Sequence, residues 1–296
     1  MKALLKIINT PPKDVFQLMK VDESYFFPSW HFHPEFEIML VLEGRGIRFV
    51  GDSMERFQAG DLVFFGKEIP HFYRSDDEYY EKTSGDNSKA LVLYFREDFL
   101  GETIWDMPDI SHLKKLISAS SRGIKFNGPV KEKIINQLRK LDDGKDSLAK
   151  VIDLLTLLQT MADARGYTLL SSRGFKHNLD EVECNRMNTV YQYIINNYSE
   201  NPSLEDVAKI AFLSGTSFCR YFKSHTNKTY TQFLNEIKIG NACKFLIEDN
   251  MSVSQVCFET GFNNFTHFNS QFKRITGITP SQYKQKHSMF ENTGVS

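Results

Sequence analysis

Residues 201–229 read NPSLEDVAKIAFLSGTSFCRYFKSHTNKT, and residues 250–280 read NMSVSQVCFETGFNNFTHFNSQFKRITGITP. The second segment repeats the pattern of the first about 50 residues later. The matching positions are Val207 and Val256, Phe218 and Phe268, Phe222 and Phe272, and Lys223 and Lys273. Repetition at such a period indicates one supersecondary unit used twice. The C-terminal part of the chain is therefore predicted to contain two like-built units.

Each copy begins with a helix-start signal. Ser203 lies three residues before Asp206, and Ser252 lies three residues before Gln255, which is the spacing of a capping box. Apolar residues then recur at helical spacing and form one stripe on a short helix. After a short break, a second helix carries phenylalanines on its inner side. Two short helices joined by a tight turn predict a helix-turn-helix, whose second helix can enter the major groove of DNA.

The outer side of each predicted second helix carries hydrogen-bonding side chains, the type that reads base edges. These are Thr216, Ser217 and Arg220 in the first copy, and Asn264, Thr266, His267, Asn269 and Ser270 in the second. Lys223, Lys273 and Arg274 lie one turn further along and suit phosphate contacts. For Thr216, Ser217 and Asn269, contact with water or phosphate is the alternative to base contact.

Three features of this region resemble the AraC/XylS family of bacterial transcription regulators: Phe-Lys near the end of each second helix, Gly261-Phe262 at the second turn, and Gly277-Ile278-Thr279-Pro280. The resemblance spans residues 186–286 and implies two helix-turn-helix units in successive major grooves. It places these residues at the grooves: Ser214, Thr216, Ser217 and Arg220, then Asn264, Thr266, His267 and Ser270. The chain differs from the family at the first turn, where Phe212 or Leu213 replaces the usual Gly.

Charge is distributed unevenly along the chain. At 296 residues the protein is long enough for two domains, and its 41% hydrophobic and 25% charged residues are typical of a soluble globular protein. Residues 1–185 carry 25 Lys and Arg against 29 Asp and Glu, whereas residues 186–296 carry 11 against 8. The basic excess at the C-terminal end favours nucleic acid as its partner.

The cysteines and the N-terminus indicate the compartment. The N-terminus becomes polar too early for a signal peptide, and no stretch approaches the ~20 apolar residues of a membrane span. The four cysteines lack C-x-x-C spacing, and Cys219 and Cys257 fall inside predicted helices, which suggests free buried thiols in a reducing environment. We therefore expect a cytoplasmic protein with no membrane partner.

The N-terminal region has the pattern of a β domain. Short apolar runs separated by Gly-rich turns over residues 4–95 predict an antiparallel barrel or sandwich. His31, His33 and Glu37 alternate on one predicted strand face, and His71 follows on a neighbouring strand. This spacing, with six residues between Glu37 and Gly44, resembles the His-x-His-x-x-x-Glu motif of the cupin superfamily, a small β-barrel fold.

The His31, His33, Glu37 and His71 group has three interpretations. It could contact a small-molecule effector, since regulators that this chain resembles commonly carry a cupin-like sensor that binds an effector, often a sugar, without metal. It could hold a divalent metal, because imidazoles and a carboxylate are suitable ligands. It could also consist of structural residues at the barrel mouth.

Three helical stretches are predicted after the barrel, near residues 110–120, 130–141 and 147–164. The last has a broad apolar stripe that either docks on its own domain or forms a helical dimer interface. The predicted domains are a cupin-like barrel (1–100), a helical dimerisation segment (101–166), a linker (167–184) and a DNA-binding domain (185–290). One helix over residues 231–249 spans about 28 Å between the two copies, close to one turn of DNA (~34 Å).

These patterns together predict a multidomain α+β protein: a cupin-like antiparallel β-barrel followed by helices, then an all-α double helix-turn-helix. The predicted function is sequence-specific regulation of transcription under control of a small-molecule effector. The expected partners are double-stranded promoter DNA, the effector and a second copy of the chain. No cofactor is required and no enzyme activity is expected; the alternative is a metal-dependent cupin enzyme fused to a DNA-binding domain.

Overall fold

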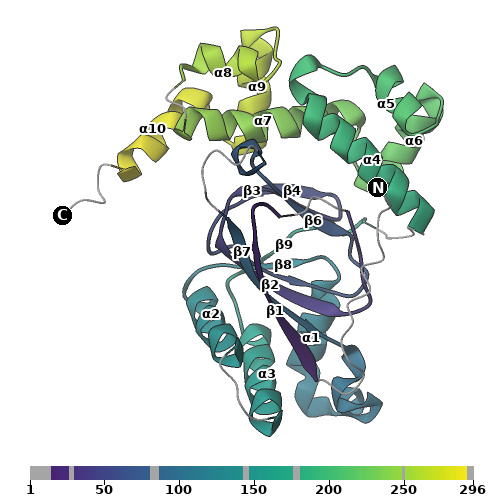
Figure 1. The fold of residues 1–296 in the computed structure, drawn as a ribbon, viewed down its shortest axis with the longest axis vertical. Helices are drawn as coiled ribbons and strands as arrows, with labels where there is room; N and C mark the ends of the chain where they lie inside the picture. The colour runs from purple at the N-terminus through teal and green to yellow at the C-terminus, as the bar shows by residue number, and fades with distance from the viewer. Residues whose placement is uncertain are drawn as a thin grey trace. The chain divides into compact units, whose positions relative to one another are not determined.

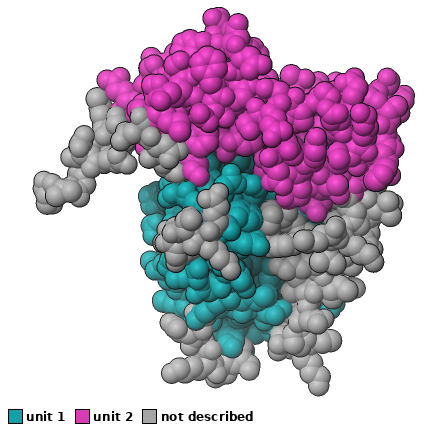
Figure 2. Space-filling model, turned by 45° about the horizontal axis from the view of Figure 1, so that its top comes forward, with its two compact units in different colours: residues 1–185 teal, residues 186–296 magenta. Residues whose placement is uncertain are grey.

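The computed structural model describes residues 15–26, 30–80, 87–142, 147–175, 181–248 and 251–291. The chain forms two compact units, residues 1–185 and residues 186–296, shown in different colours in Figure 2. The first contains all the strands of the described ranges, and the second is helical (Figure 1). An N-terminal antiparallel β domain followed by helices, with a helical C-terminal domain, is the predicted fold class.

The strands of the first unit form two antiparallel sheets. The six-stranded sheet has the order β1-β7-β2-β5-β8-β9, and the three-stranded sheet has the order β4-β3-β6. Their bounds are β1 (Phe16–Glu23), β2 (Phe36–Glu43), β3 (Gly46–Val50), β4 (Ser53–Phe57), β5 (Leu62–Phe65), β6 (His71–Ser75), β7 (Ser88–Phe95), β8 (Ile124–Phe126) and β9 (Tyr167–Leu169).

Alternation along the strands separates two cores. In β2, Met39 and Val41 contribute to a cluster that includes Tyr73 of the three-stranded sheet, whereas Ile38 and Leu40 contribute to a cluster with the helices. This follows from the period of two in a strand, which sends successive side chains to opposite faces. The face toward the smaller sheet is the one on which the candidate site lies.

Three helices cover the other face of the large sheet: α1 (Ser111–Ser120), α2 (Pro129–Asp142) and α3 (Ser147–Ala162) (Figure 1). They follow four short 3-10 helices, η1 (Asp77–Tyr79), η2 (Glu97–Leu100), η3 (Glu102–Asp106) and η4 (Pro108–Ile110). Leu154, Leu157 and Met161 of α3 are buried against the sheet, while Leu148 and Ile152 are 68% and 56% exposed. The apolar stripe of α3 thus docks on its own domain and continues onto its outer side.

Two strands were not predicted. β8 lies inside the segment assigned as helical (101–166), and β9 opens the segment assigned as linker (167–184). β8 pairs with β5, and β9 pairs with β8. Each has only three residues, too few for alternation to be recognised in the sequence. The part of the predicted linker at 176–180 lies outside the described residues.

The helix α4 (Glu181–Asn197) crosses from the first unit into the second, which also contains a 3-10 helix η5 (Tyr198–Glu200) and six further helices. These are α5 (Leu204–Ile210), α6 (Gly215–Thr226), α7 (Tyr230–Glu248), α8 (Val253–Glu259), α9 (Phe265–Thr276) and α10 (Pro280–Glu291). The pairs α5–α6 and α8–α9 are the two predicted helix-turn-helix copies, and α7 is the helix predicted between them. No helix in the described ranges is both long and apolar enough to cross a membrane.

Helix caps repeat in the two copies. Ser203 Oγ accepts a hydrogen bond from the Asp206 N–H (3.1 Å) at the start of α5. Ser252 Oγ accepts from the Gln255 N–H (3.2 Å), and Gln255 Oε1 accepts from the Ser252 N–H (2.9 Å), which completes a capping box. The caps satisfy amides that have no partner within the first helical turn.

The two helix-turn-helix turns share one backbone geometry despite their different residues. Phe212 has φ +57° and Gly261 has φ +75°. Residues after each make equivalent bonds: the Leu213 N–H donates to Ala208 O, and the Phe262 N–H donates to Cys257 O. Phe212 therefore occupies a left-handed conformation that favours glycine, with a side chain that is 91% exposed.

Candidate functional site

The first recognition helix, α6, has distinct inner and outer sides. Phe218 and Phe222 are fully buried and pack against each other at 5.4 Å between ring centroids. Thr216, Arg220 and Lys223 are exposed on the other side. The helix is held by phenylalanine packing, so its outer side is available to a major groove.

The second recognition helix, α9, repeats this arrangement. Phe268 and Phe272 are buried, with ring centroids 5.7 Å apart. The exposed residues of the predicted set are Asn264, Thr266, His267, Ser270, Lys273 and Arg274, and Asn269 is partly buried. Both helices thus present polar and basic side chains outward, as DNA reading and phosphate contact require.

Several of the predicted base-reading residues make hydrogen bonds at the start of their own helix or within it. Ser214 Oγ accepts from the Ser217 N–H (3.3 Å), and Asn264 Oδ1 accepts from the His267 N–H (2.9 Å). Asn269 Nδ2 donates to the Phe265 carbonyl (3.1 Å). These bonds give Ser214 and Asn264 a capping role at the helix start. Base contact by these residues stays a prediction.

Cys219 corrects the interpretation of the cysteines as buried thiols. It is exposed on α6, whereas Cys243 and Cys257 are buried. It lies three residues after Thr216 and four before Lys223, so helical spacing places it on the outer side between them. That spacing is the signal that could have identified it as a residue of the DNA-facing side.

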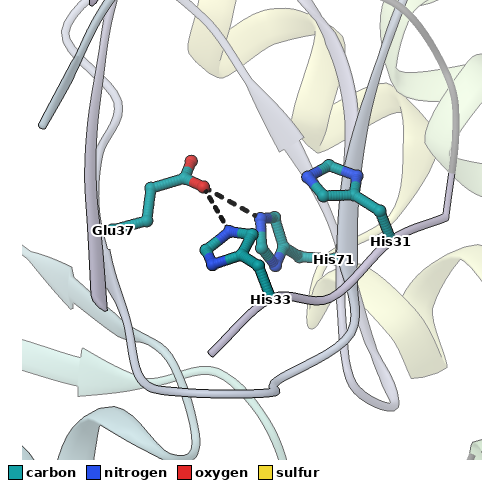
Figure 3. Close-up of side chains that lie close together, drawn as sticks. All are labelled: His31, His33, Glu37 and His71. Carbon is teal, nitrogen blue, oxygen red and sulfur yellow. Dashed lines mark hydrogen bonds and ion pairs between the residues drawn. The ribbon is translucent and has the colours of Figure 1, made fainter. Parts of the chain in front are cut away.

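The second candidate site is the His31, His33, Glu37 and His71 group (Figure 3). One potential ligand atom from each residue lies within 4.8 Å of those from the other three. His33, Glu37 and His71 are buried, and His31 is partly buried. The sequence therefore identified residues that meet in space.

The chain brings these residues together differently from the predicted strand. β2 begins only at Phe36, so His31 and His33 precede it instead of alternating with Glu37 along it. His31 and His71, the first residue of β6, form an isolated antiparallel bridge, in which each N–H donates to the other carbonyl at 3.2 and 3.0 Å. The segment before β2 pairs with β6 through this bridge. This pairing, and not alternation along β2, positions His31 and His33.

Hydrogen bonds fix the orientation of two rings. His33 Nδ1 donates to the Glu35 carbonyl (3.1 Å), and His71 Nδ1 donates to the Ile69 carbonyl (2.8 Å). A carbonyl only accepts, so we infer that each Nδ1 carries a proton. Each Nε2 then faces the same carboxylate oxygen, Glu37 Oε2, at 2.9 Å from His33 and 3.2 Å from His71.

The carboxylate is strongly biased toward its ionised form. Burial by itself raises the pKa of Glu37, but the imidazoles of His71 and His33 hold it well below its ordinary value. Burial and the charge of Glu37 raise the pKa of Tyr94 well above its ordinary value, so its hydroxyl stays protonated beside the carboxylate. A negative charge thus lies among three rings, an arrangement that suits a cation or hydrogen-bond donors.

A cavity of about 550 Å³ opens next to this group. His31, Glu37 and His71 lie on its wall. Its apolar lining consists of Met19, Val21, Phe26, Met39 and Val92, and its other polar lining consists of Glu23, Ser24, Tyr25, Tyr73 and Tyr94. Apolar walls with a few convergent polar groups are typical of small-molecule sites.

Comparison with known proteins matches a family model to each of the two parts of the chain. Residues 21–170 match the AraC-like ligand binding domain, and residues 207–286 match a helix-turn-helix domain. The chain belongs to the AraC family. As a member of this family of transcription regulators it is a DNA-binding regulator and not an enzyme.

Two of the similar proteins are named as HTH-type transcriptional regulators or activators. The chain is 25% identical over 268 residues to the HTH-type transcriptional regulator YdeC of Bacillus subtilis (strain 168), covering 87% of this chain and 86% of the relative. It is 24% identical over 267 residues, 88% of each protein, to the HTH-type transcriptional activator RhaS of Enterobacter sp. (strain 638). A crystal structure of ToxT from Vibrio cholerae covers 92% of this chain and 98% of ToxT at 13% identity, with a TM-score of 0.35.

Several cavity residues of this AraC-family protein were missed in the sequence. Met19, Met39, Val92 and Tyr94 lie on strands that pair side by side, β1, β7 and β2. Alternation along β7 relates Val92 to Tyr94 and could have placed both on the inner face. Pairing of β7 between β1 and β2 could not have been deduced, because it joins segments distant in the chain.

Proposed function

We propose that a small-molecule effector enters the 550 Å³ cavity and thereby controls binding of the C-terminal helices to promoter DNA. The observation that carries this is the position of His31, Glu37 and His71 on a cavity wall that also has apolar side chains, inside the ligand-binding domain of the family. The polar groups would orient the effector and the apolar wall would bury it. An effector that prefers one conformation shifts the population toward it. The protein would act in the cytoplasm, where promoter DNA is found.

A divalent transition metal at His31, His33, Glu37 and His71 is a second candidate, favoured by the orientation of the rings. With Nδ1 protonated, each neutral ring directs an Nε2 lone pair at the Glu37 carboxylate, which is unfavourable unless a second proton or a cation lies between them. An Nδ1–H donated to a backbone carbonyl is also the usual support of a metal-binding histidine. The donor set of imidazoles and one carboxylate suits such a metal.

Elemental analysis and native mass spectrometry of the purified protein distinguish the two candidates. A stoichiometric metal that is absent from Glu37→Gln supports the metal, and a co-purifying organic molecule with no metal supports direct effector contact. Trp30, fully buried beside His31, offers a fluorescence readout for titration of either. Glu43→Gln is the matched control for Glu37→Gln, because Glu43 lies at the exposed end of β2, the strand that carries Glu37. If neither a metal nor any small molecule changes DNA binding, the control function of the cavity is wrong.

We further propose that the protein is a homodimer joined through the outer side of α3. Leu148 and Ile152 lie there one turn apart and largely exposed, at the spacing of a helix–helix contact. A second copy presents the same apolar row, so a two-fold contact would cover both. Ile152→Asp should convert the dimer to a monomer in light scattering, while Ser118→Asp, on the exposed side of α1, tests whether any added charge has that effect. A wild-type monomer at all concentrations would exclude this interface.

A further inference from the structure

A lysine is buried in the middle of α7, the helix that joins the two helix-turn-helix copies. Lys238 is only 3% exposed, and among the described residues no carboxylate pairs with its ammonium. Its Nζ donates to Asn201 Oδ1 and to the Gly261 carbonyl (2.9 Å), and it lies 5.0 Å from the centroid of the Phe262 ring. A buried cation without a counter-ion is unfavourable, so its neutral partners have to compensate.

These partners belong to different helix-turn-helix copies. Asn201 lies two residues before Ser203, the cap of α5, and therefore at the entrance to the first copy. Gly261 and Phe262 form the turn of the second copy, directly before α9. Asn201 Nδ2 also donates to the Gly261 carbonyl (2.7 Å), so one carbonyl of the second turn accepts from both Asn201 and Lys238.

The backbones at this junction are in close contact. A Cβ added to Gly261 would lie 2.3 Å from the Ser199 carbonyl oxygen and 2.8 Å from its carbon. The second turn therefore rests directly on η5, at the end of which Asn201 adopts a left-handed φ of +56°. Because the backbone of the second turn contacts the backbone of η5 directly, the two elements have little freedom to rotate against each other.

We propose that Lys238 and Asn201 are positioning residues that fix the direction of α9 relative to the first copy, and so set the half-site spacing that the protein accepts on DNA. The apolar cluster of α7, α8 and α9 attaches the second copy to α7, but apolar contacts are not directional. The hydrogen bonds at Gly261 supply a direction and join the second copy to the first. This proposal goes beyond effector control, since it concerns how the protein reads DNA whether or not an effector occupies the cavity.

Half-site spacing is the quantity that tests this role. The full-length protein is first used to select a site from random double-stranded DNA. Binding is then measured by fluorescence anisotropy on that site and on versions with one base pair inserted or removed between the half-sites. Half-sites here are the two DNA segments that α6 and α9 of one chain would contact. One base pair rotates the second half-site by about 34°, and wild type should bind each altered site at least about tenfold more weakly. Lys238→Met keeps the apolar stem, and this penalty should fall below about threefold.

Controls separate positioning from stability. Lys244→Met makes the same change at the other lysine of α7 and should keep the wild-type penalty. Asn201→Gly keeps the left-handed backbone and removes the side-chain amide that contacts Lys238 and the Gly261 carbonyl. It should therefore lower the spacing penalty by itself, which keeps the test valid if Lys238→Met fails to fold. Equal weakening on all three sites, or an unchanged spacing penalty in both junction variants, would overturn the proposal.

Discussion

Gly261→Ala should destabilise the second helix-turn-helix far more than a strained backbone alone would. An alanine at φ +75° costs about 1–2 kcal/mol, since a Cβ is disfavoured in the left-handed region. Its Cβ would also lie 2.3 Å from the Ser199 carbonyl oxygen, a backbone atom that cannot move aside as a side chain would. Such overpacking adds about 1–3 kcal/mol, so the total is about 2–5 kcal/mol.

Gly277→Ala is the matched control for this change. Gly277 has φ +83°, but a Cβ there would meet nothing within 4 Å. It should cost only the conformational part, about 1–2 kcal/mol. Phe212→Gly, at the equivalent first turn, should instead stabilise by about 0.5–1 kcal/mol, because relief of its left-handed strain exceeds the entropy that glycine adds to the unfolded chain.

Hydrogen exchange of the full-length protein measures these differences locally. A cost of 2–5 kcal/mol corresponds to about 30-fold to several-thousand-fold faster exchange of α9 amides, at 1.4 kcal/mol per factor of ten. Both tryptophans, Trp30 and Trp105, lie in the first unit, so their fluorescence checks that the N-terminal domain is unchanged. If Gly261→Ala and Gly277→Ala exchange alike, the close approach to Ser199 does not constrain the turn and the reasoning fails.

Three further predictions concern side chains of the second unit. Arg220→Ala should weaken binding to the selected DNA site by about 1–3 kcal/mol and relax specificity at one base pair; a uniform loss over all sequences would make Arg220 a phosphate contact. Lys223→Ala should weaken binding to all sequences and reduce the salt slope of anisotropy titrations by about one, and an unchanged slope would exclude a phosphate contact. Burial lowers the pKa of Lys238 to about 8, below the 10.5 of an unfolded lysine, so its folded state binds fewer protons between these values. The free energy of unfolding should therefore rise with pH over that window by at most about 1.4 kcal/mol per unit, and urea titrations should show less of this rise in Lys238→Met.

The sequence by itself determined the repeated unit and its polarity. Caps at Ser203 and Ser252 and phenylalanines at helical spacing are local signals, because a helix is specified by residues three and four positions apart. The same local logic placed Thr216, Arg220 and Lys223 on the outer side. It also selected His31, His33, Glu37 and His71, although the strand invoked to join them begins later than expected.

Only the tertiary structure decided the features that depend on contacts between distant segments. The strands β8 and β9 exist because a sheet edge was available for pairing, and three residues carry no periodicity of their own. The cavity beside Glu37 depends on β7 lying between β1 and β2. The junction of Lys238, Asn201 and Gly261 joins residues up to 60 positions apart. From sequence alone, a lysine on a helix is expected to be exposed to solvent, and only the packing of distant segments shows that Lys238 is buried.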